Sequence, residues 1–186
     1  MEKDLIQQPS SCQRIAFVGP ESTGKTTLSQ TMATLHHTEW VREYMRLYLQ
    51  EKWDKQRAVC TWEDLLPIAK GQVHLENEAL SKAKQYLFCD TCLLELVIYS
   101  YIYYGKCEPI IEQHALSHKY DHIFLTYIDV PWQADDLRDK PHERESVFAF
   151  FQEQLDARGI KYQILKGSVE ERILQVESKE LSNKNL

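Results

Sequence analysis

The sequence lacks long hydrophobic runs, because no stretch approaches the roughly 20 apolar residues that a membrane-spanning helix requires. Residues 1–11 are polar and lack the apolar centre of a signal peptide. Positive charge is also scarce: 22 Lys and Arg stand against 28 Asp and Glu, for a formal net charge of −6 at pH 7. This balance offers no overall basic surface for nucleic acid or an anionic membrane. We therefore expect a cytoplasmic protein with neither as a partner, and the oligomeric state stays open.

Cysteine is sparse and its pattern does not indicate disulfides. The five cysteines are odd in number and scattered, at Cys12, Cys60, Cys89, Cys92 and Cys107, which is unlike a secreted disulfide framework. Cys89 and Cys92 form a C-x-x-C pattern, which a redox pair or half of a metal site could use, but no second pair follows at zinc spacing. We favour the interpretation that Cys89 and Cys92 are simply two small apolar side chains at the end of a strand.

Residues 19–26 have the sequence Gly-Pro-Glu-Ser-Thr-Gly-Lys-Thr, which is the pattern of a phosphate-binding P-loop. Its glycines allow backbone N–H groups to surround phosphates, and the next helix presents its positive N-terminal end to them. Lys25 would reach the β and γ phosphates, and the Thr26 hydroxyl would bind Mg²⁺. A chance match in a glycine turn is the alternative, but an apolar strand before the motif and a helical pattern after it argue against chance.

Strand and helix patterns alternate along the rest of the chain. Short apolar runs predict strands at 14–18, 38–41, 86–90, 122–128 and 162–165. Apolar residues at helical spacing predict helices at 25–35, from 42 to about 50, at 65–84, 93–103 and 109–119, around 148–159, and after Ser168. The 186 residues, 43% of them hydrophobic, fit one domain. The predicted fold class is α/β, a P-loop NTPase three-layer sandwich with a central, mostly parallel sheet of about five strands.

Two carboxylates follow predicted strands at the edge where the P-loop lies. Asp90 ends an apolar strand, a position from which P-loop proteins hold Mg²⁺ directly or through water, and its alternative role is a helix N-cap. Glu43 follows the second predicted strand and could orient or deprotonate an acceptor hydroxyl, or could simply be a surface glutamate. The choice between Glu43 and Asp90 as the base stays open.

The polar stretch at 132–144 is interpreted as a lid. Arg138 and Arg144 could close over the γ-phosphate, or could pair with neighbouring aspartates on a solvated surface. Trp132 is either a hinge packed on the core or an aromatic plate for a planar ring. Contacts to adenine are expected near Gly167–Arg172. His114 and His118 share one face of a predicted helix, and we favour an exposed surface over a zinc site there because no further ligand lies nearby in the sequence.

A family resemblance rests on an ordered set of motifs. They are 19–28, Glu43-Tyr44-Met45-Arg46, Gly71-Gln72, Asp90-Thr91, Tyr104-Gly105, and Trp132 followed by Asp135 and Leu137-Arg138. In these the chain resembles, from about residue 14 to residue 172, the kinase domain of NadR-type proteins, which phosphorylate nicotinamide riboside with ATP. The resemblance implies an extension at 1–13, a P-loop kinase domain at 14–177 with the lid at 132–144, and a tail at 178–186. The larger NadR proteins also carry an adenylyltransferase domain, for which we expect no room in 186 residues.

The resemblance also implies roles for residues of this chain. ATP would be bound by Gly19, Glu21, Ser22, Thr23, Gly24, Lys25, Thr26, Thr27 and Arg172, with Mg²⁺ on Thr26 and Asp90. Catalysis would use Lys25, Glu43, Asp90, Arg138 and Arg144. The nucleoside would contact Glu43, Tyr44, Asp90, Trp132 and Asp135.

The chain departs from the family pattern in two places. It has Asp90-Thr91-Cys92 where the family tends to have Asp-Thr-Asp, and Ala134-Asp135-Asp136-Leu137-Arg138 where the family tends to have Asp-Asp-Gly-Leu-Arg. Both changes lie on the acceptor side or in the lid, so they bear on the identity of the acceptor more than on nucleotide binding.

The predicted function is therefore an ATP-dependent kinase of NAD biosynthesis that transfers the γ-phosphate to a nucleoside hydroxyl, with nicotinamide riboside the favoured acceptor. Two alternatives remain: a P-loop ATPase or nucleotide switch that acts on a protein partner, and a kinase for another nucleoside. The sequence does not distinguish ATP from GTP.

Overall fold

The computed structural model describes residues 2–135, 137 and 142–182, and it is built around one parallel sheet. The sheet order is β2-β3-β1-β4-β5, and each strand pairs with its neighbours in parallel. The strands are β1 (Gln13–Val18), β2 (Glu39–Val41), β3 (Tyr86–Asp90), β4 (His122–Thr126) and β5 (Gln163–Leu165). The predicted fold class is confirmed, and all five strands in the described residues are parallel.

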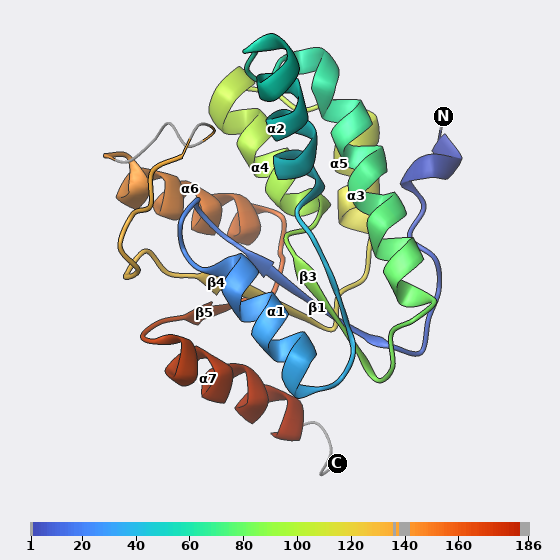
Figure 1. Cartoon of the computed structure of the whole chain (residues 1–186), viewed down its shortest axis with the longest axis vertical. Helices are drawn as coiled ribbons and strands as arrows, with labels where there is room; N and C mark the ends of the chain where they lie inside the picture. The colour runs from blue at the N-terminus through green and yellow to red at the C-terminus, as the bar shows by residue number, and fades with distance from the viewer. Residues whose placement is uncertain (1, 136, 138–141, 183–186) are drawn as a thin grey trace.

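Helices cover both faces of this sheet. They are α1 (Lys25–Leu35), α2 (Tyr44–Gln56), α3 (Leu65–Leu80), α4 (Leu93–Tyr104), α5 (Pro109–Ser117), α6 (Arg144–Ala157) and α7 (Val169–Ser182), with short 3-10 helices η1 (Glu2–Leu5) and η2 (Trp62–Asp64). Figure 1 shows α1 and α7 side by side below the sheet, while α3, α4, α5 and α6 lie above it and share one core. The arrangement is a three-layer sandwich.

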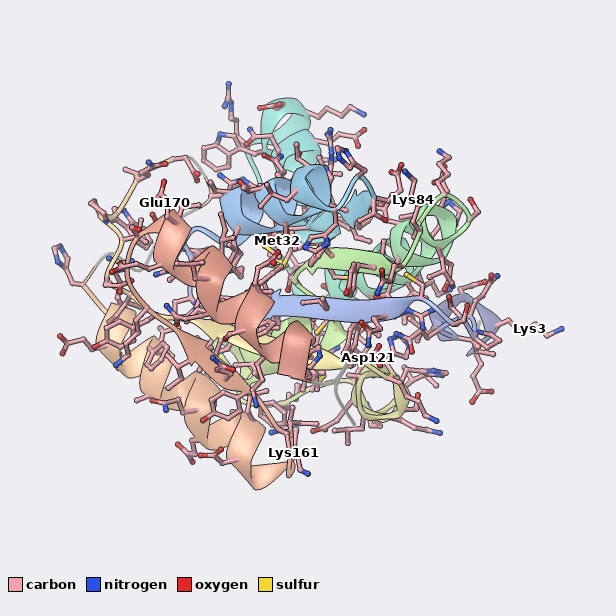
Figure 2. The ribbon with its side chains drawn as sticks, turned by 90° about the horizontal axis from the view of Figure 1, so that it is seen from below. Lys3, Met32, Lys84, Asp121, Lys161 and Glu170 are labelled. Carbon is pink, nitrogen blue, oxygen red and sulfur yellow. The ribbon has the colours of Figure 1, made fainter. Side chains whose placement is uncertain are left out.

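Alternate residues of β1 supply two separate cores. Ile15 and Phe17 pack in one cluster with Met32 of α1 and with α7, whereas Ala16 and Val18 belong to the larger cluster with α3, α4, α5 and α6. The side-chain period of two in a strand causes this division, and a strand covered on both faces must be apolar throughout. Met32 is fully buried, whereas the labelled Lys3 and Lys161 lie at the outer edge of the molecule in Figure 2.

Several element boundaries differ from the sequence prediction. α2 continues to Gln56, beyond the predicted end near Gln50, and stops where Arg57 adopts a left-handed conformation. α3 ends at Leu80 and not at Lys84, because the Lys84 N–H bonds to the Thr38 hydroxyl on the way into β3. Thr61 and Asp64 form a capping box ahead of α3.

The N-terminal residues pack against the body of the protein. Leu5 is fully buried, its carbonyl oxygen lies 2.8 Å from the His118 ring, and Asn77 donates to the Ile6 carbonyl. At the other end, α7 runs to Ser182 and so includes the first residues of the segment 178–186. The division into 1–13, 14–177 and 178–186 remains a prediction.

The expectation for the histidine pair is wrong. His114 is buried and His118 is half-buried, because η1 packs over this side of α5. The described residues contain no group of three His, Cys, Asp or Glu side chains that could hold a metal ion. Over the same residues, no helix is long and apolar enough to cross a membrane.

Candidate nucleotide-binding site

The P-loop lies at the carboxyl end of β1, between β3 and β4. Gly19 has φ of 144°, and a Cβ there would meet the Thr126 hydroxyl of β4 at 2.7 Å, so only glycine fits. Gly24 has φ of 85° where the loop turns into α1. Thr23 also bonds to Thr126, with 2.6 Å between their hydroxyl oxygens. Glycine conformations and hydroxyl contacts together hold the loop against β4.

Lys25 is buried at the base of this loop. Its Nζ donates to the carbonyl of Gly19 at 2.6 Å and to that of Pro20 at 3.1 Å, and lies 3.2 Å from Oε1 of Glu95. Burial alone would lower the pKa of Lys25, but neighbouring carboxylates, led by Glu95, raise it. The lysine is therefore positively charged and fixed before any phosphate binds.

Glu95 is a site residue that the sequence analysis missed. It lies in the first turn of α4, is 3% exposed, and accepts the Gly19 N–H through Oε2 at 3.0 Å. Burial, aided by the charge of Glu43, raises the pKa of Glu95 to about 7 against the opposing effect of Lys25. The available signal was a lone carboxylate in the almost wholly apolar run 93–104.

Thr26 and Asp90 form a pair suited to Mg²⁺. The Thr26 hydroxyl donates to Oδ2 of Asp90 at 2.6 Å, while Oδ1 is buried and has no hydrogen-bond partner among the described residues. Burial and the charge of Glu43 raise the pKa of Asp90 to about 6. A hydroxyl beside a carboxylate with a spare buried oxygen fits a hard cation that prefers oxygen ligands.

The backbone on both sides of Glu43 is hydrogen-bonded to Gln72 of α3. The Tyr44 N–H donates to the Gln72 side chain at 2.7 Å, and Gln72 in turn donates to the Arg42 carbonyl at 3.2 Å. A Cβ at Gly71 would meet the Tyr44 ring at 2.0 Å, so the motif Gly71-Gln72 gives the ring room and fixes the loop. The ring of Tyr44 thus packs on α3, whereas Glu43 lines the P-loop cavity.

The residues after β4 fold back over the P-loop. Arg144, at the start of α6, donates to the carbonyls of Val130 at 2.8 Å and Ser22 at 3.1 Å. The Trp132 ring lies 5.8 Å from the Arg144 guanidinium carbon, and Gln133 N–H donates to the Ser22 hydroxyl at 2.8 Å. Arg144 therefore fastens this segment to the loop.

A second contact ties the segment to α2. Asp135 forms an ion pair with Arg46 at the surface. Arg138, one of the predicted lid arginines, lies outside the described residues, as does most of 136–141. The described part of the lid is thus anchored at Arg144 on one side and at Arg46 on the other.

Arg172 of α7 organises the other side of the loop. It is 2% exposed and donates to the Thr23 carbonyl at 2.6 Å and to the Tyr127 carbonyl at 3.1 Å, and it pairs with Asp129. A cavity of about 390 Å³ lies beside it, lined by Gly24, Thr27, Leu28, Asp129, Val130, Pro131, Gly167, Ser168, Val169 and Arg172. The guanidinium is committed to protein groups, so Arg172 shapes this cavity.

Two further cavities adjoin at the P-loop. One of about 340 Å³ contains Lys25, Thr26, Glu43 and Glu95. The other, of about 250 Å³, is apolar and aromatic, with walls that include Trp53, Tyr99, Tyr103 and Tyr104 from α2 and α4. Glu21, Met45 and Tyr99 line both cavities. Trp132 lines neither of them and lies instead in a small hollow beside Arg144.

Cys89 and Cys92 are buried thiols. Burial raises the pKa of both, for Cys92 to about 12. Cys92 lines a small pocket together with Glu43 and Glu95. The position after Asp90-Thr91 therefore presents a neutral group to this pocket.

Comparisons with known proteins agree with this geometry. The trifunctional NAD biosynthesis/regulator protein NadR of Escherichia coli strain K12 is 27% identical over 131 residues, which cover 70% of this chain and 32% of NadR. The chain thus spans about a third of the length of that relative. The sequence-based resemblance to NadR is confirmed.

Solved structures show the same fold. NadR in complex with NAD and AMP-PNP has a TM-score of 0.69 at 19% identity, covering 84% of this chain and 45% of that one, and NadR in complex with NR has a TM-score of 0.69 at 19% identity, covering 85% and 46%. Deoxyadenosine kinase from M. mycoides, with products dCMP and dCDP, has a TM-score of 0.67 at 13% identity over 91% of this chain and 100% of that one. The AAA domain family matches residues 14–172, which include the whole sheet from Arg14 onward and the P-loop, so the chain belongs to the AAA domain family.

Proposed function

We propose that this protein is an ATP-dependent kinase that transfers the γ-phosphate to the hydroxyl of a nucleoside, with nicotinamide riboside the favoured acceptor. The observation that carries the proposal is the direct junction of two cavities, one polar at the P-loop and one aromatic, through Glu21, Met45 and Tyr99. A phosphate chain fits the first and a planar ring the second, so the reacting oxygen of an acceptor would lie between them.

The donor side follows from the P-loop. The 340 Å³ cavity contains the Lys25 ammonium and the start of α1, which suit the β and γ phosphates of ATP. Thr26 and Asp90 would hold Mg²⁺, which neutralises phosphate charge when bound. The AMP-PNP complex of NadR supports ATP as donor. The cavity beside Arg172 and Gly167 is of a size and position to take the base.

Glu43 is the better placed of the two candidate bases. Asp90 already accepts a hydrogen bond from Thr26 and has a spare oxygen for the metal. The Glu43 carboxylate lines the P-loop cavity and makes no hydrogen bond or ion pair within the described residues. In the proposed reaction the acceptor oxygen bonds to the γ-phosphorus, the bond from that phosphorus to the bridging oxygen breaks to leave ADP, and the hydroxyl proton passes to Glu43.

The acceptor side favours an aromatic base. Trp53, Tyr99 and Tyr103 form walls on which a planar or cationic ring can lie. The NR complex of NadR supports a ring of this kind. The role proposed from sequence for Trp132 would need the segment around it to move, because the ring now lies on Arg144.

Phosphoryl transfer with a panel of acceptors tests the proposal. We expect ATP and Mg²⁺ to convert nicotinamide riboside to its 5′-phosphate faster than other nucleosides, detected by mass spectrometry. Lys25→Ala is the negative control. If only another nucleoside is phosphorylated, the protein is a kinase with a different acceptor. If the protein binds ATP but phosphorylates no acceptor, the result favours the alternative of an ATPase or nucleotide switch.

A further inference from the structure

We propose that Glu95 is a positioning residue for the P-loop: its carboxylate holds Lys25 in place before nucleotide binds and weakens nucleotide affinity by its charge. This inference rests on the nucleotide-binding part of the proposed function. It goes beyond that function because it assigns a role to a residue that no P-loop motif contains.

Glu95 connects two parts of the loop, since Oε2 accepts the Gly19 N–H at 3.0 Å and Oε1 lies 3.2 Å from the Lys25 ammonium. Both side chains are almost fully buried, with side-chain exposures of 8% and 4% for Lys25 and Glu95. A buried pair of this kind has one defined arrangement, so it sets where the ammonium lies.

The P-loop cavity is lined by two cations, Lys25 and Arg46, and the carboxylates of Glu43, Asp90 and Glu95 all act on the Lys25 ammonium. Glu95 itself lines that cavity. A polyphosphate that enters must share the lysine with Glu95, and the carboxylate repels it at close range in a poorly solvated site. Removal of the charge alone should therefore tighten nucleotide binding.

Glu95 lies in the first turn of α4 between apolar neighbours, and its carboxylate contacts the P-loop groups Gly19 and Lys25. A buried carboxylate with partners confined to the loop is thus explained by its effect on the loop.

The main test compares two substitutions at one position. Glu95→Gln keeps the shape and an oxygen for the Gly19 N–H but removes the charge, whereas Glu95→Asp keeps the charge. We expect Glu95→Gln to bind ATP about tenfold more tightly in calorimetric titrations and to have a lower kcat, because Lys25 is less well fixed. Glu95→Asp should stay close to the unsubstituted protein in affinity.

Glu76→Gln is the matched control. Glu76 is another buried carboxylate paired with a cation, Arg14, but on α3 and away from the P-loop. We expect its ATP affinity to be unchanged. Equal affinity in Glu95→Gln and the unsubstituted protein would overturn the inference, as would equal shifts in Glu95→Gln and Glu95→Asp, which would indicate packing and not charge.

A second measurement does not depend on Glu95→Gln being folded. Lys25→Met leaves Glu95 buried without its cation, so the melting temperature of the nucleotide-free protein should fall, and more at pH 8 than at pH 6. An unchanged melting temperature would contradict the inference. If the unsubstituted protein binds no ATP, the proposed function fails, and the Lys25→Met result still decides whether Glu95 positions the lysine.

Discussion

Two buried ion pairs lie at opposite ends of β1, and they differ in what surrounds them. At the amino end, Arg14 pairs with Glu76 at 3.1 Å, and Glu76 also accepts hydrogen bonds from Gln7 at 2.8 Å and Tyr120 at 2.7 Å. At the carboxyl end, Lys25 faces Glu95 together with further carboxylates, beside a cavity of about 340 Å³. Both oxygens of Glu76 are bonded to protein groups, whereas Lys25 and Glu95 line a cavity that a ligand can enter.

The difference separates a structural role from a functional one. A buried pair whose partners are all protein groups holds its elements in one arrangement. Burial, together with the charge of Glu43, raises the pKa of Asp90 to about 6 and that of Glu95 to about 7. Such perturbed carboxyl groups in a cleft are typical of functional sites.

The largest expected effect is at the carboxyl end. Lys25→Ala should lower phosphoryl transfer by roughly a thousandfold, because the charge that neutralises the transferred phosphate is lost. Steady-state kinetics with ATP and the acceptor would measure it. Retention of more than a tenth of the activity would show that Lys25 does not have this role.

At the amino end, Glu76→Ala should act on stability. It leaves the Arg14 guanidinium buried without its partner, which costs about 3–5 kcal/mol of the free energy of unfolding. Urea denaturation would measure the loss, and ATP affinity of the folded fraction should be unchanged. If Glu76→Ala lowers ATP affinity but not stability, the Arg14–Glu76 pair has a functional role and the proposed difference between the two pairs is wrong.

A smaller effect is expected for a substitution at Gly71, where α3 packs against Tyr44. Gly71→Ala places a methyl group at 2.0 Å from the Tyr44 ring, so the ring and the Glu43 loop must shift. We expect about 1–3 kcal/mol lower stability from overpacking and a raised KM for the acceptor. Gly159→Ala is a suitable control, because a Cβ there meets nothing within 4 Å and its cost comes from its φ of 65° alone. Equal KM values in both variants would remove the proposed link between Gly71 and the acceptor.

The smallest expected effect is a pH dependence of stability. Because the pKa of Glu95 is raised to about 7 from an ordinary 4.5, the folded protein binds this proton more tightly than the unfolded chain does. The contribution of Glu95 is therefore fully present below about pH 4.5 and is lost as pH rises through 7. Between pH 5 and pH 8, the difference in melting temperature between Glu95→Gln and the unsubstituted protein should therefore shift by a few degrees in favour of Glu95→Gln. The opposite trend would contradict the raised pKa.

Much of the sheet and one side of the site were predictable from sequence. The apolar runs at β1 and β3 and the P-loop glycines determine where Lys25, Thr26 and Asp90 meet, because carboxyl ends of parallel strands share an edge. Glu95 was missed because its role depends on how α4 lies under the loop. The roles of Gly71 and Tyr44 were also hidden, since only packing between α2 and α3 brings them together. Residue spacing carries no information on either contact.

The most direct test of the kinase assignment is the rate of ADP formation from ATP and Mg²⁺, measured with and without nicotinamide riboside. We predict slow ADP formation without the acceptor and a many-fold increase with it, matched mole for mole by the phosphorylated nucleoside. An ADP rate that is the same with and without every nucleoside offered would contradict the account.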